Sequence, residues 1–112
     1  MTPAHRAALE RAKARLDRLD LYPRPVRIEG VHVLVAPWFF RLPRLRRYRG
    51  YALVRTILLR QACSSDDLIT HELCHVWQMQ QRPLRVLLAS LTTRYASNPY
   101  ELEARRAVAE TR

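Results

Sequence analysis

Residues 64–81, SSDDLITHELCHVWQMQQ, carry the clearest structural signal in the chain. The stretch opens with serines that can cap the free amides of a helix. Asp66 and Asp67 follow, and their charges favour the positive end of a helix dipole. Pro83 then interrupts the pattern. We therefore predict a helix from about Asp66 to Gln81.

The middle of this helix contains the pattern H-E-x-x-H, as HELCH at residues 71–75. His71 and His75 are four residues apart, so both imidazoles lie on one helix face and can bind the same metal ion. Neutral imidazole is a preferred ligand of Zn²⁺. Glu72 lies about 100° around the helix from His71, near enough to reach a water on the metal without ligating it. The alternative is a pair of surface histidines that flank a helical glutamate, but the strong helix start favours a zinc site.

The segments before this helix predict another helix and a small sheet. Residues 4–21 have apolar side chains at helical spacing, which is typical of an amphipathic helix, and prolines follow at positions 23 and 25. Residues 31–35, VHVLV, predict a buried strand. Residues 38–50 are irregular and strongly basic, and residues 51–60 return to strand character as one bent strand or two short ones.

Two more helices are predicted after Pro83. One extends to about Tyr95, and the last begins at Asn98 and Pro99, a helix cap followed by proline at the first helical position. A chain of 112 residues can bury enough surface to form one domain. We therefore expect a single α+β domain over residues 1–112, with an N-terminal helix, a small twisted sheet, the H-E-x-x-H helix and a C-terminal helix.

A catalytic zinc site needs a third protein ligand and an open fourth position. No histidine follows His75, so a downstream ligand must be Glu101, Glu103 or Glu110. Glu101 lies at the edge of the apolar face of the last predicted helix, which favours it as the ligand. The other interpretation of Glu101 is a capping box with Asn98.

The two motifs together resemble those of gluzincin metallopeptidases. Residues 71–78, HELCHVWQ, and residues 98–104, NPYELEA, are similar to the H-E-x-x-H and E-x-E-A signatures of that family. Their short spacing resembles the minimal single-domain minigluzincins. The resemblance implies a zincin-like fold in which His71, His75 and Glu101 hold Zn²⁺ and Glu72 is the general base of peptide-bond hydrolysis. It also implies that an extended peptide or protein substrate pairs with an edge strand near residues 51–60.

The chain departs from the family at two points. Arg105 stands where relatives often have an aspartate that orients a zinc-bound histidine. The candidates to replace that aspartate are Asp66, Asp67 and Glu103. The chain also has no late histidine to stabilise the oxyanion. The candidates for this second role are Tyr95 and Tyr100, with Arg94 behind them.

Cys74 supports a different interpretation of the motif. A thiolate binds zinc strongly, and a site closed by Cys74 would be structural. The sequence HELCH is also similar to SprT-like peptidases, which act on proteins crosslinked to DNA, but their third ligand is a histidine that this chain lacks. Burial as a small apolar residue is the more ordinary role for such a cysteine.

The net charge of +10 is compatible with nucleic acid or an anionic surface as a partner. All basic residues except Lys13 are arginine, however, a bias that a GC-rich genome also produces. The aromatic and arginine-rich residues 38–49 fit a binding patch, or a solvated loop whose aromatic rings enter the core. The second functional hypothesis is therefore a basic binding module in which zinc is structural and no catalysis occurs.

Cysteine content and the N-terminal residues favour a cytoplasmic protein. The chain has two cysteines, and residues 1–10 are too polar for a secretory signal. The longest apolar stretch, residues 31–40, is interrupted by His32 and Pro37 and is shorter than the ~20 residues of a membrane span. We expect no transmembrane segment.

Overall fold

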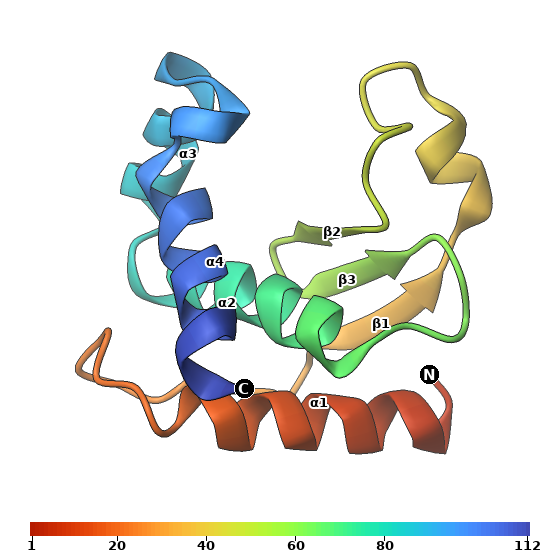
Figure 1. Cartoon of the computed structure of the whole chain (residues 1–112), viewed down its shortest axis with the longest axis horizontal. Helices are drawn as coiled ribbons and strands as arrows, with labels where there is room; N and C mark the ends of the chain where they lie inside the picture. Colours follow the sequence, from red (N-terminus) through yellow and green to blue (C-terminus); the bar gives the residue numbers. More distant parts are fainter.

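The computed structural model describes all 112 residues and has the α+β architecture that the sequence predicts, with four α-helices and one three-stranded sheet. In Figure 1, α1 runs along the base of the molecule, α2 lies above it beside the sheet, and α4 stands across α2. The elements, in chain order, are α1 (Pro3–Leu16), β1 (His32–Val35), the 3-10 helix η1 (Pro37–Arg41), β2 (Gly50–Leu53), β3 (Thr56–Leu59), α2 (Asp66–Gln81), α3 (Pro83–Thr92), the 3-10 helix η2 (Tyr95–Ser97) and α4 (Pro99–Thr111).

The sheet has the order β1-β3-β2, with β1 parallel and β2 antiparallel to the central strand β3. Residues 51–60 therefore form two short strands of a hairpin, whose turn includes Val54 with a positive φ of 53°. Because β3 pairs on both sides, only β2 of this segment has a free edge. Of the two sequence-based alternatives, one bent strand or two short ones, the structure has the second, and the edge strand of this segment is β2.

α2 has the bounds that the sequence predicts. The Ser65 hydroxyl accepts a hydrogen bond from the amide of Leu68 at 3.1 Å, which satisfies one of the free donors of the first turn. After Arg82, Pro83 begins α3 with its ring at a position where no amide hydrogen is needed. The Asn98 side chain caps α4 in the same way by accepting from the amide of Tyr100 at 2.9 Å.

Two helices end earlier than predicted. α1 stops at Leu16, and the amides of Arg18 and Leu19 form tight turns back to the carbonyls three residues earlier. Asp17 and Asp20 lie at the negative end of this helix, where their charges oppose its continuation. α3 stops at Thr92 and not near Tyr95. The hydroxyls of Thr92 and Thr93 donate to the carbonyls four residues earlier, a local bonding that competes with helix extension.

The hydrophobic core lies between α1, α2, α4 and one face of the sheet. Leu9 and Leu16 of α1, Ile57 of β3, and Leu73 and Trp77 of α2 are all almost fully buried in it. This core covers the side of α2 that faces away from the histidines. It therefore fixes the orientation of the opposite, polar side of the helix.

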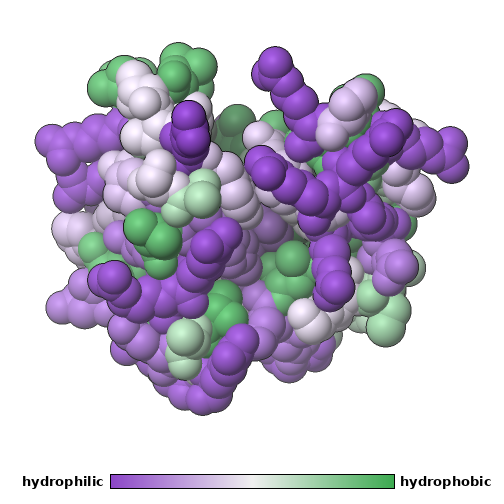
Figure 2. Space-filling model, turned by 45° about the horizontal axis from the view of Figure 1, so that its top comes forward, coloured by the Kyte–Doolittle hydropathy of each residue, from purple (hydrophilic) through white to green (hydrophobic).

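A cleft of about 920 Å³ opens on that polar side. One wall is formed by β2 and the loop that precedes it, and the other by α3, η2 and the start of α4. The two walls rise as separate ends of the molecule in Figure 1, and the space-filling view shows the hollow between them (Figure 2). None of the helices has both the length and the apolar character that crossing a membrane requires.

Candidate metal centre and cleft

α2 and α4 bring three potential metal ligands together. His71 and His75 project from successive turns of α2, with their Nε2 atoms 3.2 Å apart. Glu101, in the first turn of α4, places one carboxylate oxygen 3.0 Å from Nε2 of His71 and the other 2.9 Å from Nε2 of His75. Glu101 is buried and makes no hydrogen bond to the cap residue Asn98, so its side chain serves the histidine pair and not the helix end.

The donor set fits a zinc ion. Two imidazole nitrogens and one carboxylate oxygen are a common catalytic zinc set, and the three residues are the one such cluster in the molecule. Bonds of about 2.0–2.1 Å in a tetrahedron place neighbouring ligand atoms about 3.3–3.4 Å apart. The two imidazole nitrogens, 3.2 Å apart, are close to this spacing, and each has one oxygen of the Glu101 carboxylate within 3.0 Å. His75 and Glu101 also line the cleft, which leaves a side of the site open to a further ligand.

A hydrogen-bond chain behind His75 determines which of its ring nitrogens can bind a metal. The amide nitrogen of Gln78 donates to the carbonyl of Tyr100 at 2.8 Å and to Glu103 at 3.0 Å. The amide oxygen of Gln78 therefore faces His75 and accepts from Nδ1–H at 2.8 Å. This bond leaves the Nε2 lone pair directed at the site. Tyr22 completes the chain by donating to Glu103 at 2.5 Å.

The sequence suggested three acidic residues that could orient a zinc-bound histidine, and the structure brings only one of them near His75. Glu103 takes part, but through Gln78 and not by direct contact with a histidine. Asp66 pairs with Arg11, and Asp67 pairs with Arg15 and Arg112, which ties α2 to α1 and to the end of the chain. Neither aspartate contacts His71 or His75.

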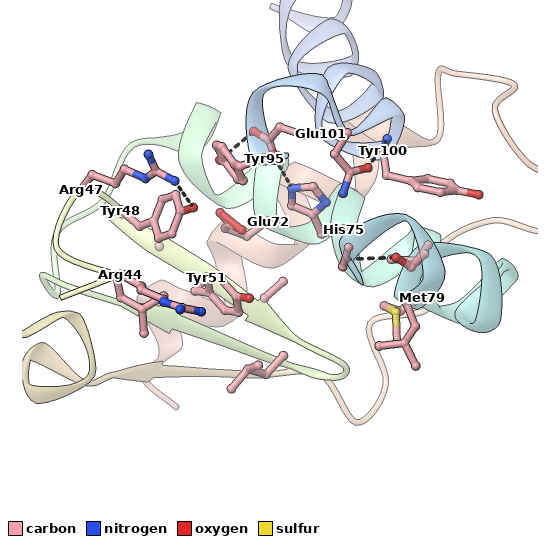
Figure 3. Close-up of a pocket in the computed structure, with 18 of the residues that line it drawn as sticks. Arg44, Arg47, Tyr48, Tyr51, Glu72, His75, Met79, Tyr95, Tyr100 and Glu101 are labelled. Carbon is pink, nitrogen blue, oxygen red and sulfur yellow. Dashed lines mark hydrogen bonds and ion pairs between the residues drawn. The ribbon is translucent and has the colours of Figure 1, made fainter. Parts of the chain in front are cut away.

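Glu72 lies between the histidines and the cleft. Its side chain is 5% exposed, and its carboxylate forms no hydrogen bond or ion pair with the protein, although it lines the cleft. Figure 3 shows it pointing into the space between Tyr51 and His75. Burial raises the pKa of Glu72 above its ordinary value, and the nearby His75 and His71 lower it only in part. No fully buried side-chain polar atom in the molecule lacks a partner, so the Glu72 oxygens reach the open space of the cleft. A largely buried carboxylate with a raised pKa that faces a cleft is a candidate functional group.

The electrostatics of the ligand cluster show a competition for protons. Burial acts to raise the pKa of Glu101, but the hydrogen bonds from His71 and His75 outweigh it, and the pKa falls well below its ordinary value. Burial acts to lower the pKa of His75, but the hydrogen bond to Glu101 and the charge of Glu72 raise it overall. A metal bound at the same three atoms would displace these protons.

Tyr95 contacts the cluster directly. Its hydroxyl donates to Glu101 at 2.8 Å, and its ring lies between the guanidinium groups of Arg47 and Arg105, 5.6 and 5.7 Å from the ring centre. Arg105 also reaches Glu101, with Nε 3.3 Å from the carboxylate. The ring of Tyr100, in contrast, points away from Glu72 (Figure 3), and only its backbone carbonyl joins the network. Of the two tyrosine candidates, the geometry favours Tyr95; Arg94 makes no side-chain contact with the cluster.

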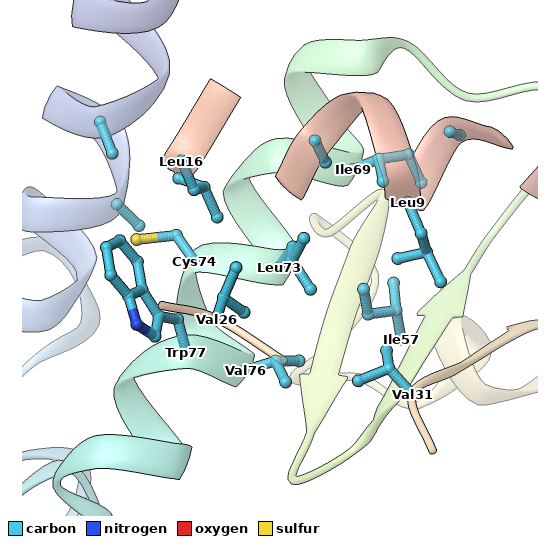
Figure 4. Close-up of a cluster of buried hydrophobic side chains, with 14 of the residues drawn as sticks. Leu9, Leu16, Val26, Val31, Ile57, Ile69, Leu73, Cys74, Val76 and Trp77 are labelled. Atoms are coloured by element: carbon cyan, nitrogen blue, oxygen red, sulfur yellow. The ribbon is translucent and has the colours of Figure 1, made fainter. Parts of the chain in front are cut away.

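Cys74 points to the opposite side of α2. It is completely buried in the core beside Trp77 and Leu16 (Figure 4), and it is not part of the ligand cluster. Burial raises the pKa of its thiol far above the ordinary value, which disfavours the thiolate that zinc requires. The interpretation of Cys74 as a closing ligand is contradicted by this orientation.

Several residues of the site lack a signal in the sequence. Gln78 lies one helical turn after His75, so the face it occupies could have been inferred, but its partners on α4 could not. Tyr48 and Tyr51 line the cleft beside Glu72 because of the sheet topology. Gly50 lies so close to α2 that a Cβ there would be 3.3 Å from Cγ of Glu72, so any side chain at this position would have to displace Glu72 by a few tenths of an ångström.

Comparisons with known proteins identified no relative of this chain. A scan against protein-family models matched none, and searches of curated proteins and of solved structures found no similar protein. The chemistry of the site therefore follows from its own residues.

Proposed function

We propose that the protein is a zinc-dependent peptidase whose site is formed by His71, His75, Glu101 and Glu72. The observation that carries the proposal is the position of Glu72, a buried carboxylate without a protein partner that lines the cleft beside three converging metal ligands. A purely structural metal site would have no need of this carboxylate, since burying it costs free energy.

When bound, Zn²⁺ would supply Lewis-acid polarisation of a carbonyl and would lower the pKa of a water molecule. Glu72 would accept the proton of the attacking water as its oxygen adds to the peptide carbonyl. The C–N bond then breaks, and Glu72 returns the proton to the leaving amine nitrogen.

Two other features support the reaction. Tyr95, whose hydroxyl donates to Glu101 at 2.8 Å, lies beside the ligand cluster, and we assign it the stabilisation of negative charge on the carbonyl oxygen once that hydroxyl turns from Glu101 to the substrate. The free edge of β2, from Gly50 to Leu53, lines the cleft and offers backbone groups to an extended peptide. Tyr95 and the β2 edge lie on opposite walls, so a bound peptide would pass between them.

The competing functions make different demands on the same residues. A SprT-like peptidase would need a histidine where this site has Glu101. A basic binding module would leave Glu72 without a role, although the arginines on the cleft wall favour an anionic partner of some kind.

Metal content and hydrolysis test the proposal together. Protein purified without chelator should contain about one zinc per chain and should cleave a denatured casein-like substrate, with activity lost to a chelator and restored by zinc. His71→Ala should lose both zinc and activity. The matched control is His32→Ala, since His32 is exposed on β1 and its side chain makes no hydrogen bond or ion pair. Full zinc in His71→Ala, or cleavage that persists in its absence, would contradict the proposal.

A further inference from the structure

The helix that follows the metal helix is apolar and almost uncovered. α3 carries leucines at positions 84, 87, 88 and 91, the spacing of a single helix face, and their exposed fractions lie between 54 and 80%. Ala89 is the one buried residue of the helix. An exposed row of this kind on a small protein marks a binding surface.

The opposite wall of the cleft ends in a second exposed surface of different character. Residues 37–49 expose Trp38, at 65%, and Leu42, at 52%, while Phe40 is buried against Leu58. The same segment carries five arginines, at positions 41, 44, 46, 47 and 49, all exposed. None of the five forms an ion pair, whereas Arg11, Arg15, Arg105 and Arg112 elsewhere do.

These two surfaces lie on the same side of the molecule. α3 and residues 37–49 rise as the two upper ends in Figure 1, with the mouth of the cleft between them. In Figure 2, which brings this side forward, hydrophobic atoms gather at one end, and long hydrophilic side chains project from the other. A single flat partner could therefore touch both ends at once.

The composition of the two surfaces distinguishes among the partners. A second copy of the chain is disfavoured, because two molecules that each have a net charge of +10 repel one another. In addition, α3 has ten residues and is only about 15 Å long. One face of so short a helix cannot bury the ~800 Å² per subunit that a stable dimer interface needs. Nucleic acid would pair with the arginines but would leave the leucine row in water. An anionic lipid surface accommodates both, since its headgroups attract guanidinium groups and its acyl boundary accepts leucine and tryptophan.

We propose that the protein binds an anionic lipid surface with the mouth of its cleft, through the leucines of α3 on one end and residues 37–49 on the other. The apolar side chains enter the interface while the unpaired arginines contact lipid headgroups. This placement depends on neither zinc nor hydrolysis, so it stands or falls separately from the peptidase proposal.

Vesicle sedimentation tests the leucine contribution. The full chain should bind vesicles of phosphatidylglycerol and phosphatidylcholine, and should bind pure phosphatidylcholine vesicles at least tenfold more weakly. Leu88→Ser/Leu91→Ser should weaken binding to the anionic vesicles at least tenfold. The matched control is Leu34→Ser/Leu102→Ser, which removes two exposed leucines from β1 and α4 and should bind as the wild type does.

A second pair of variants tests the arginine contribution. Arg41→Gln/Arg44→Gln should weaken binding to the anionic vesicles about tenfold. Arg6→Gln/Arg106→Gln removes the same charge from exposed positions on α1 and α4 and should have a much smaller effect. If both pairs of variants lost the same affinity for the anionic vesicles, net charge alone would explain the binding, and the proposal would be overturned.

Three further outcomes would also overturn it. The first is no binding to anionic vesicles by wild-type protein whose folding is verified by circular dichroism. The second is a lipid-free dimer in sedimentation velocity that Leu88→Ser/Leu91→Ser dissociates, since α3 would then pair with a second copy. The third is tight binding of an oligonucleotide that displaces the vesicles and is unaffected by the leucine substitutions.

Discussion

α2 and α3 are separated by a single residue, Arg82, yet their surroundings are opposite. α2 buries eight side chains, among them Trp77. Two of its buried polar residues, Glu72 and Gln78, belong to the candidate metal site or contact it, and the third, Thr70, donates to a carbonyl of its own helix. α3 is the more apolar helix by sequence, but it buries only Ala89. Apolar content therefore does not decide coverage in this molecule. The position of a helix relative to the sheet and α1 decides it, and the leucines of α3 are left for an external surface.

The largest effect should come from truncating the buried side of α2. Trp77→Ala removes a nearly fully buried ring and its hydrogen bond to the carbonyl of Arg24, and should destabilise the fold by about 3–5 kcal/mol. Leu88→Ala/Leu91→Ala on α3 should change stability by no more than about 0.5 kcal/mol per residue.

Urea denaturation followed by circular dichroism measures both variants without relying on tryptophan fluorescence. If Trp77→Ala does not fold, Trp77→Phe should give a smaller loss of the same sign. Similar losses of stability in the α2 and α3 variants would contradict the contrast between the two helices, because the leucines of α3 would then have to be covered in the free protein.

A smaller effect is expected at Gln78, which connects the buried side of α2 to the candidate metal ligand His75. Gln78→Leu keeps the approximate volume but removes the acceptor for Nδ1–H of His75, so zinc affinity should fall roughly 10–100-fold. Competition with a chromophoric chelator gives the affinity. Gln80→Leu is the control, since Gln80 also loses two hydrogen bonds, to Arg27, far from the site. Equal affinities for both variants would show that Gln78 does not orient the ligand.

The sequence predicts α2 and its histidines well because their signals are local. The Ser65 cap, the two aspartates and Pro83 all act within one turn of the helix ends. The hairpin in residues 51–60 has no such signal. Its turn places Val54 at positive φ, a conformation that β-branched residues strongly avoid, so no residue of the usual turn type marks it.

Long-range packing explains the remaining differences. Glu101 could be selected from its place in a short final helix, but the pairing of Gln78 with Tyr100 and Glu103 depends on how α4 crosses α2. The exposure of α3 could not be predicted either, because the spacing of apolar residues predicts which helix face is apolar but not what covers that face.

The smallest expected change in metal content is at Cys74. Cys74→Ser should keep its zinc, because the side chain points into the core and not toward His71. It should destabilise the fold by about 1–3 kcal/mol, since a hydroxyl in place of the thiol is buried among apolar side chains. Metal analysis and thermal melting measure the two effects. Loss of zinc in Cys74→Ser together with retention in Glu101→Gln would reverse the ligand assignment.

The most direct test of the proposed chemistry is Glu72→Gln. The substitution keeps the size of the side chain and leaves all three ligands in place, so zinc content should barely change. The melting temperature should stay the same or rise slightly, because the substitution removes a buried charge. Hydrolysis of a denatured protein substrate should fall by ~10²-fold or more, the usual contribution of a positioned general base. Glu110→Gln, at an exposed position on α4, should remain fully active. A Glu72→Gln protein that holds zinc and cleaves at the wild-type rate would contradict the assignment of Glu72 as the general base.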